Sequence, residues 1–149
     1  MLPRFKFKFS DFGFTLVELL IVTGVLTFLL AMVLIAINPG AQLAAARNTQ
    51  RHSDVNVILN AVGQYLVKYG SLPAGITTSA QIVRSSGGLD ICSLLVTEFV
   101  AALPADPSSG SYTDCTNYNT GYTIAKSATN NRVTVSAPSA ESATVTVSR

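Results

Sequence analysis

The chain has 149 residues, which is enough for one compact domain and little more. Charged residues make up 12% of it, about half the roughly 25% that is usual in soluble domains, and this excludes an intrinsically disordered acidic or basic protein. The formal net charge of +2 lacks the basic excess of a dedicated nucleic-acid binder, and one His with two Cys are too few for a zinc site of four Cys and His. The apolar residues, 48% of the total, are unevenly distributed along the chain.

The apolar residues concentrate in the run from Phe14 to Ile37, in which Glu18 is the only charged residue. As an α-helix this run extends about 36 Å, which is enough to cross a hydrocarbon core of roughly 30 Å. The run also lacks the polar stripe that a soluble core helix shows every 3.6 residues. We therefore predict a membrane-spanning helix over residues 14–37.

Basic residues precede this span at Arg4, Lys6 and Lys8, and Asp11 offsets them in part. Positive residues that flank a first span tend to stay in the cytoplasm. The sequence thus predicts a single pass through the cytoplasmic membrane, with residues 1–13 inside and the chain beyond about residue 38 outside.

Glu18 is a carboxylate inside the predicted span. At the centre of a membrane a charged side chain costs about 2.5–3.5 kcal/mol on insertion scales, and it needs a partner. A glutamate one turn into a helix is also favoured by the helix dipole. The dipole does not account for the residues around Glu18, which suggest a more specific interpretation.

The ten-residue segment GFTLVELLIV, residues 13–22, resembles the N-terminal signature of type IV prepilins and of the related pseudopilins of type II secretion systems. The resemblance implies that residues 1–13 are a leader peptide, which a prepilin peptidase/methyltransferase removes by cutting between Gly13 and Phe14. It implies N-methylation of the new terminal residue, Phe14, and it matches Glu18 to the glutamate at the fifth position of the mature family members.

The cut would create an α-amino group on Phe14, which is cationic below a pKa of about 7.7–8.0. Two charges tolerate a dry core only as a pair. The resemblance therefore implies that Glu18 of one subunit pairs with the Phe14 amine of a neighbouring subunit during assembly. The implied partners are copies of the same chain in a helical filament, an inner-membrane assembly platform, and membrane lipid before assembly. The filament is expected at the cell surface or in the periplasm.

Beyond the span, Asn38-Pro39-Gly40 predicts a kink or short break. A stripe of apolar residues with helical spacing follows, at Val55, Leu59, Val62, Leu66 and Tyr69. The sequence predicts an amphipathic stalk helix over residues 38–70, stopped by Gly70 and Pro73. Polar residues expected mainly off the stripe are Asp54, Asn56, Asn60, Gln64 and Lys68.

Residues 71–149 are expected to form an extracytoplasmic head. Asp90 is predicted to cap a short helix that reaches Leu103, ahead of Pro104. Three alternating segments predict an antiparallel meander, namely Tyr122–Ala125, Val133–Ser136 and Thr144–Val147. The fold class is α+β, with a long N-terminal helix packed on a small antiparallel sheet, as the resemblance to pilins also implies.

Cys92 and Cys115 are the only cysteines. An even number of cysteines outside the cytoplasm usually pairs, so we expect one disulfide, which would close a loop of roughly 24 residues and contribute about 3 kcal/mol. Two free buried thiols are the alternative in a reducing compartment.

Residues that support catalysis or cofactor binding do not stand out. His52 is expected on a solvated helix surface, and Asp106 and Asp114 are interpreted as turn acids rather than calcium ligands. The sequence thus indicates no enzyme, no cofactor, no metal and no nucleic-acid partner. The leading hypothesis is a filament subunit. The alternatives are a pseudopilin of type II secretion or DNA uptake, and an uncleaved single-pass anchored protein whose head binds a ligand.

Overall fold

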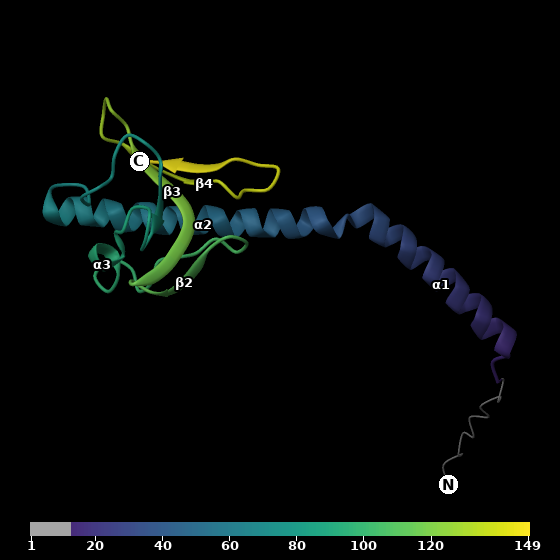
Figure 1. Cartoon of the computed structure of the whole chain (residues 1–149). Coiled ribbons are helices and arrows are strands. Elements are labelled where there is room, and N and C mark those ends of the chain that lie inside the picture. The colour runs from purple at the N-terminus through teal and green to yellow at the C-terminus, as the bar shows by residue number, and fades with distance from the viewer. Residues whose placement is uncertain (1–12) are drawn as a thin grey trace, which may run out of the picture. The chain divides into compact units, whose positions relative to one another are not determined.

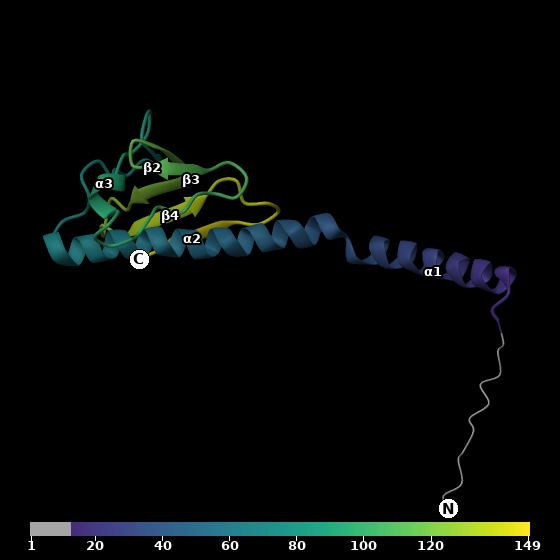
Figure 2. The same ribbon diagram turned by 90° about the horizontal axis from the view of Figure 1, so that it is seen from below.

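The computed structural model describes residues 13–149 and is shown from two sides in Figures 1 and 2. The leader predicted over residues 1–13 therefore lies, except for Gly13, outside the described residues. The basic residues on which the predicted orientation rests lie outside them too. The chain divides into two units, Met1–Pro39 and Gly40–Arg149, and each is described by itself.

The first unit contains helix α1, Leu16–Ile37, which has 22 residues. None of its residues is buried, and it is the single helix among the described residues that is long and apolar enough to cross a membrane. The helix ends at Asn38, whose φ of 47° lies in the left-handed region that stops helices. The predicted break at this point is confirmed, and α1 runs without interruption up to it.

Helix α2, Pro39–Tyr69, has 31 residues, and all of them except Pro39 belong to the second unit. Proline suits the first helical position because that position needs no backbone donor. The predicted apolar stripe is buried at Val55, Leu59 and Val62, whereas Leu66 and Tyr69 remain largely exposed. The expectation that Asp54 lies off the buried face is wrong, since this residue is buried against the sheet.

Five strands form one antiparallel sheet in the order β1-β3-β4-β5, and β2 also pairs with β3. Their bounds are β1 Gln81–Arg84, β2 Ser111–Asp114, β3 Asn117–Lys126, β4 Val133–Ala137 and β5 Val145–Ser148. The last three are the predicted meander, with Val135 opposite both Ile124 and Val147. The sequence prediction missed β1 and β2 because neither strand alternates: β1 has the adjacent apolar residues Ile82 and Val83, and β2 has a single apolar residue, Tyr112.

The core of the second unit lies between α2 and one face of the sheet, as Figure 2 shows. Strand residues that point to this face are buried, namely Tyr122, Ile124, Val133, Val135 and Val145. The α+β fold class is therefore confirmed, with a long apolar N-terminal helix and a small antiparallel sheet.

Helix α3, Cys92–Leu95, is much shorter than predicted. It ends because the backbone of Val96 is extended and that of Thr97 adopts a φ of 73°. Val96 forms an isolated β-bridge with Val100. The expectation that this helix reaches Leu103 is wrong. Asp90 does contact the start of α3, since Asp90 Oδ1 accepts a hydrogen bond from the Cys92 amide at 3.3 Å.

Candidate functional site

Gly13 and Phe14, the predicted cleavage junction, are both exposed just ahead of α1. The side chain of Phe14 keeps 74% of its surface accessible. A Cβ atom on Gly13 would meet no atom of the described residues within 4 Å. Packing among the described residues therefore does not require glycine at this position.

Glu18 lies in the first turn of α1, where Thr15 caps the helix. Thr15 Oγ1 accepts a hydrogen bond from the Glu18 amide at 3.2 Å, and the Thr15 carbonyl accepts one from the Leu19 amide at 3.2 Å. Threonine three residues before glutamate is the spacing of a capping box. The sequence prediction missed this cap, although the Thr-x-x-Glu spacing signals it.

The polar side chains of α1 differ in whether their own helix satisfies them. Thr23 Oγ1 donates to the Leu20 carbonyl at 3.1 Å, and Thr27 Oγ1 donates to the Gly24 carbonyl at 2.9 Å. The Glu18 carboxylate, by contrast, makes no hydrogen bond or ion pair within residues 13–149. In an apolar environment α1 therefore presents one group that requires a partner from outside the helix.

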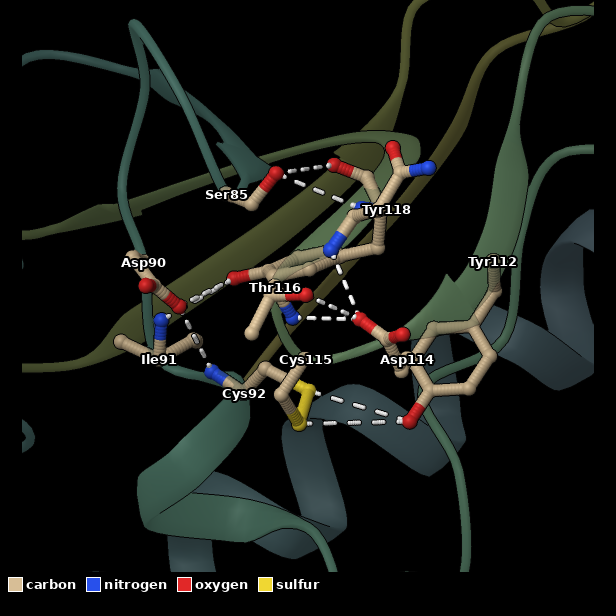
Figure 3. The surroundings of a disulfide bond; sticks show 10 residues. Ser85, Asp90, Ile91, Cys92, Tyr112, Asp114, Cys115, Thr116 and Tyr118 are labelled. Atoms are coloured by element: carbon tan, nitrogen blue, oxygen red, sulfur yellow. Dashed lines mark hydrogen bonds between the residues drawn. A yellow bond between two sulfur atoms is a disulfide. The ribbon is translucent and has the colours of Figure 1, made fainter.

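Cys92 and Cys115 form a disulfide that ties the start of α3 to the β2–β3 turn (Figure 3). The expected bridge is present, and both cysteines of the chain are engaged in it. The hydroxyl of Tyr112 lies 3.8 Å from one sulfur and 3.9 Å from the other.

Two exposed carboxylates flank the disulfide in Figure 3. Asp90 Oδ1 accepts a hydrogen bond from the Tyr118 hydroxyl at 2.8 Å, and burial together with this bond raises the pKa of Tyr118. Asp114 Oδ1 accepts bonds from the Thr116 hydroxyl at 2.6 Å and from the Thr116 and Asn117 amides at 2.7 and 2.9 Å. These bonds lower the pKa of Asp114, which is a turn acid as predicted.

Asp106 is more than the turn acid that the sequence suggests, because it forms a buried ion pair with Arg51 of α2. Arg51 Nε donates to Asp106 Oδ2 at 2.6 Å, and both side chains have 0% of their surface exposed. Burial opposes ionisation of Asp106, but hydrogen bonds from Arg51, Ser108 and Ser109 outweigh it and hold its pKa well below the usual range. The sequence did not predict this ion pair, because its two residues are 55 positions apart and no local pattern connects them.

Glu141, in the β4–β5 connection, extends this cluster to the surface. Its carboxylate accepts two bonds from Arg47, at 2.6 and 2.5 Å, and one from Arg51 at 3.2 Å. The hydrogen bonds from Arg47 and Arg51, opposed by desolvation, lower the pKa of Glu141 to about 2. We call Arg47, Arg51, Asp106 and Glu141 the arginine cluster, which fixes two separate loops to one helix.

Asp54 forms a second buried polar contact between α2 and the sheet. Its Oδ2 accepts a hydrogen bond from the Tyr122 hydroxyl at 2.7 Å, and its Oδ1 accepts one from Gln50 Nε2 at 2.8 Å. Burial and the Asp54 carboxylate together raise the pKa of Tyr122. The polar atoms of this contact are satisfied within the subunit, so we assign it a structural role.

The residues described by the structure contain no group of three His, Cys, Asp or Glu side chains that could hold a metal ion. His52 is exposed on α2, as expected.

No protein-family model, no curated protein and no solved structure matches this chain. The fold defines the class as an α+β protein with a candidate membrane-anchoring helix at its N-terminal end. The resemblance to prepilins rests on the chemistry and spacing of residues 13–22.

Proposed function

We propose that this chain is a structural subunit of a type IV pilus-like filament, made as a prepilin, cleaved after Gly13 and N-methylated on Phe14. The observation that carries the proposal is the surface of α1. Every residue of the helix is exposed and nearly all are apolar, while its single unpartnered carboxylate lies in the first turn beside the Gly13–Phe14 junction. Polymerisation through α1 supplies both an apolar environment and a partner for Glu18.

In the proposed chemistry, cleavage has to precede assembly. Before cleavage, the nitrogen of Phe14 is a neutral amide and offers no charge to a carboxylate. After cleavage it is an amine, cationic at neutral pH, and methylation is compatible with that charge. A Glu18 carboxylate in a dry filament core is tolerated only beside a cation. Processing thus creates the group that assembly requires, so uncleaved subunits are kept out of the filament.

The location proposed is the cytoplasmic membrane, spanned once by α1 with residues 1–13 on the cytoplasmic side and the head outside. The subunit then moves into an extracytoplasmic filament at the cell surface or in the periplasm. The disulfide supports an oxidising compartment for the head. The proposed partners are copies of the chain, the prepilin peptidase/methyltransferase, the assembly platform and membrane lipid.

The first test is the N-terminus of the mature protein, measured by intact-mass spectrometry after expression in a cell that carries a prepilin peptidase. The expected product begins at Phe14 and carries one extra methyl group. Gly13→Ala is expected to keep residues 1–13, and Gly24→Ala is the matched control, because a Cβ at either position meets nothing within 4 Å. A wild-type product that retains its leader would refute the proposal.

The second test concerns Glu18. Glu18→Gln is expected to be cleaved normally but to lose filaments in electron micrographs, because a neutral amide does not pair with the Phe14 amine. Thr27→Val is the control, since the Thr27 hydroxyl is already satisfied by its own helix and its removal should leave assembly intact. Wild-type filament yields from Glu18→Gln would remove the role assigned to the carboxylate. Filaments confined to the periplasm would favour a secretion pseudopilus over a surface pilus.

A further inference from the structure

The C-terminal half of α2 borders three adjoining hollows in the surface of the head. Their volumes are about 470, 240 and 410 Å³, and neighbouring hollows share lining residues. We call this surface the hairpin groove; the residues used to define it are Gly63, Val67, Leu72, Lys126, Asn131 and Arg149. It lies between α2, the β3–β4 hairpin and the end of β5.

Two residues that α2 contributes to the hairpin groove, Gly63 and Val67, leave room for another molecule. Val67 has 87% of its surface exposed. Gly63 lies within α2, where glycine costs about 0.5–1 kcal/mol relative to alanine, yet a Cβ there would meet no atom within 4 Å. Within the described part of the chain, nothing requires glycine at this position. Close approach by another molecule accounts for both the glycine and the exposed valine.

The ionisable side chains of the hairpin groove are cationic. Lys126 and Arg149 line it, Arg132 lies in the hairpin beside it, and no Asp or Glu is among the residues that line the three hollows. None of these three cations forms an ion pair within residues 13–149. Lys68 also lines the groove, but it pairs with Glu98. The groove therefore suits a partner that brings carboxylates.

The same chain carries such carboxylates on another surface, which we call the disulfide face: Asp90 and Asp114, on either side of Cys92–Cys115 (Figure 3). Neither acid has a cationic partner within residues 13–149. Arg84 belongs to the same end of the sheet and keeps its charge, but its guanidinium donates to the Gly87 carbonyl at 2.7 Å and forms no ion pair with either acid.

The disulfide face and the hairpin groove do not meet within one subunit. The β2–β3 turn precedes β3 and the β3–β4 hairpin follows it, so the ten residues of this strand separate them. Figure 1 shows α3 and β2 on one side of α2, and the end of β5 with the β3–β4 hairpin on the other. Two complementary surfaces at opposite ends of a strand can engage each other only between copies.

We propose that the disulfide face of one copy docks in the hairpin groove of the next, with Asp90 and Asp114 facing Lys126 and Arg132. This inference rests on the proposed function, because it names the head-to-head contact of the same filament. The contact joins two different patches and is therefore heterologous, which is the kind of contact that builds an open filament when it does not close into a ring. The disulfide holds the acidic face in one conformation, which lowers the entropic cost of docking.

Chemical crosslinking tests the contact directly, because residues 14–149 contain only two lysines, Lys68 and Lys126. Filaments of the processed protein, assembled from a mixture of ¹⁴N- and ¹⁵N-labelled subunits, are treated with a carbodiimide that joins amines to carboxylates. Mass spectrometry should find Lys126 joined to Asp90 or Asp114 in peptides of mixed isotope. The Lys68–Glu98 link within one subunit is the internal control. Filaments that show the control link, but join Lys126 to other acids or to none, would overturn the contact.

Substitutions test it independently. Arg132→Glu places like charges opposite each other and is expected to reduce the polymerised fraction at least about tenfold. Gly63→Trp should fill the groove with a similar loss, while His52→Trp, on the exposed surface of α2 outside the groove, should assemble normally. Unfolding midpoints for each variant show that the head still folds. Normal filaments from Arg132→Glu and Gly63→Trp would refute this contact alone. Wild-type protein that is never cleaved or polymerised would refute the proposed function as well.

Discussion

Replacing Arg51 with methionine tests the energetic role of the arginine cluster. The substitution keeps an unbranched side chain in α2 but removes the cation that Asp106 pairs with. Asp106 would keep its bonds from the Ser108 amide and hydroxyl and from the Ser109 amide, at 2.9, 2.8 and 3.0 Å. It would still be a carboxylate with 0% side-chain exposure and no counter-charge.

Breaking a buried pair by removing one partner typically costs about 3–5 kcal/mol. The whole unfolding free energy of a domain is about 5–15 kcal/mol, so this loss is a large part of it. At about 2 kcal/mol per molar urea, a loss of about 4 kcal/mol lowers the urea midpoint by about 2 M. The assay is near-ultraviolet circular dichroism of the full chain in detergent, since the chain has five tyrosines and no tryptophan.

Arg47→Met is the matched control. Arg47 contacts the same cluster from the same helix, but its side chain is 37% exposed and that of its partner Glu141 is 33% exposed. Exposed pairs contribute about 0–1 kcal/mol, so this variant should stay close to wild type. The double variant Arg51→Met with Asp106→Leu should recover most of the lost stability, because no uncompensated charge remains buried. An Arg51→Met midpoint as high as that of Arg47→Met would refute this reasoning.

Three further predictions concern the second unit. Replacing Cys92 and Cys115 together by serine should lower the unfolding free energy by about 3 kcal/mol, because the unfolded chain regains the freedom of a closed loop. The urea midpoint should stay constant from about pH 7 to pH 5 and should decrease once the pH is below about 4. The reason is that folding lowers the pKa values of Asp106 and Glu141, so their protonation favours the unfolded chain. Gly63→Ala should raise the unfolding free energy by about 0.5–1 kcal/mol, since alanine restricts the unfolded chain and its Cβ meets no atom within 4 Å apart from the backbone of its own helix.

Each of these predictions has its own control. Dithiothreitol should destabilise the wild type and leave the double serine variant unchanged; equal effects on both would contradict the role of the bridge. Asp106→Leu with Arg51→Met should flatten part of the acid transition, and an unchanged pH profile would assign that transition to other groups. Gly121→Ala should destabilise, because φ is +75° there and a Cβ would lie 2.9 Å from that of Asp106. Stabilisation by Gly121→Ala would contradict the conformational reasoning.

The elements that the sequence predicted correctly are those with a strong local pattern. Helix α1 follows from an uninterrupted apolar run, α2 from a stripe of period 3.6, and β3 to β5 from alternating Val, Ile and Thr. Strands β1 and β2 lack such an alternation, and they form because β3 offers them hydrogen bonds along its length. The end of α3 depends on the left-handed Thr97, a conformation that threonine does not signal.

The polar contacts of α2 show why part of the site region was missed. Arg51 lies four residues before Val55, and Asp54 lies four residues before Ile58, so helical spacing places both on the buried face. Hydrophobicity alone assigns charged residues to the surface, and only a partner distant in sequence reverses that assignment. For Arg51 that partner is Asp106, and for Asp54 it is Tyr122. Gly13, Phe14 and Glu18 need no such partner within the subunit, and their proposed roles stay predictions.

The cap of α1 has a consequence for the timing of any cut at Gly13. Thr15 and Glu18, which begin the helix, both lie on the C-terminal side of the junction. Among the described residues, the first hydrogen bonds of α1 are therefore made with Thr15 and not with Gly13. A cut after Gly13, as proposed above, would leave the cap of α1 in the mature chain. In the proposed function, cleavage would place the charged amine of Phe14 next to the N-terminus of α1, and the helix would not have to refold.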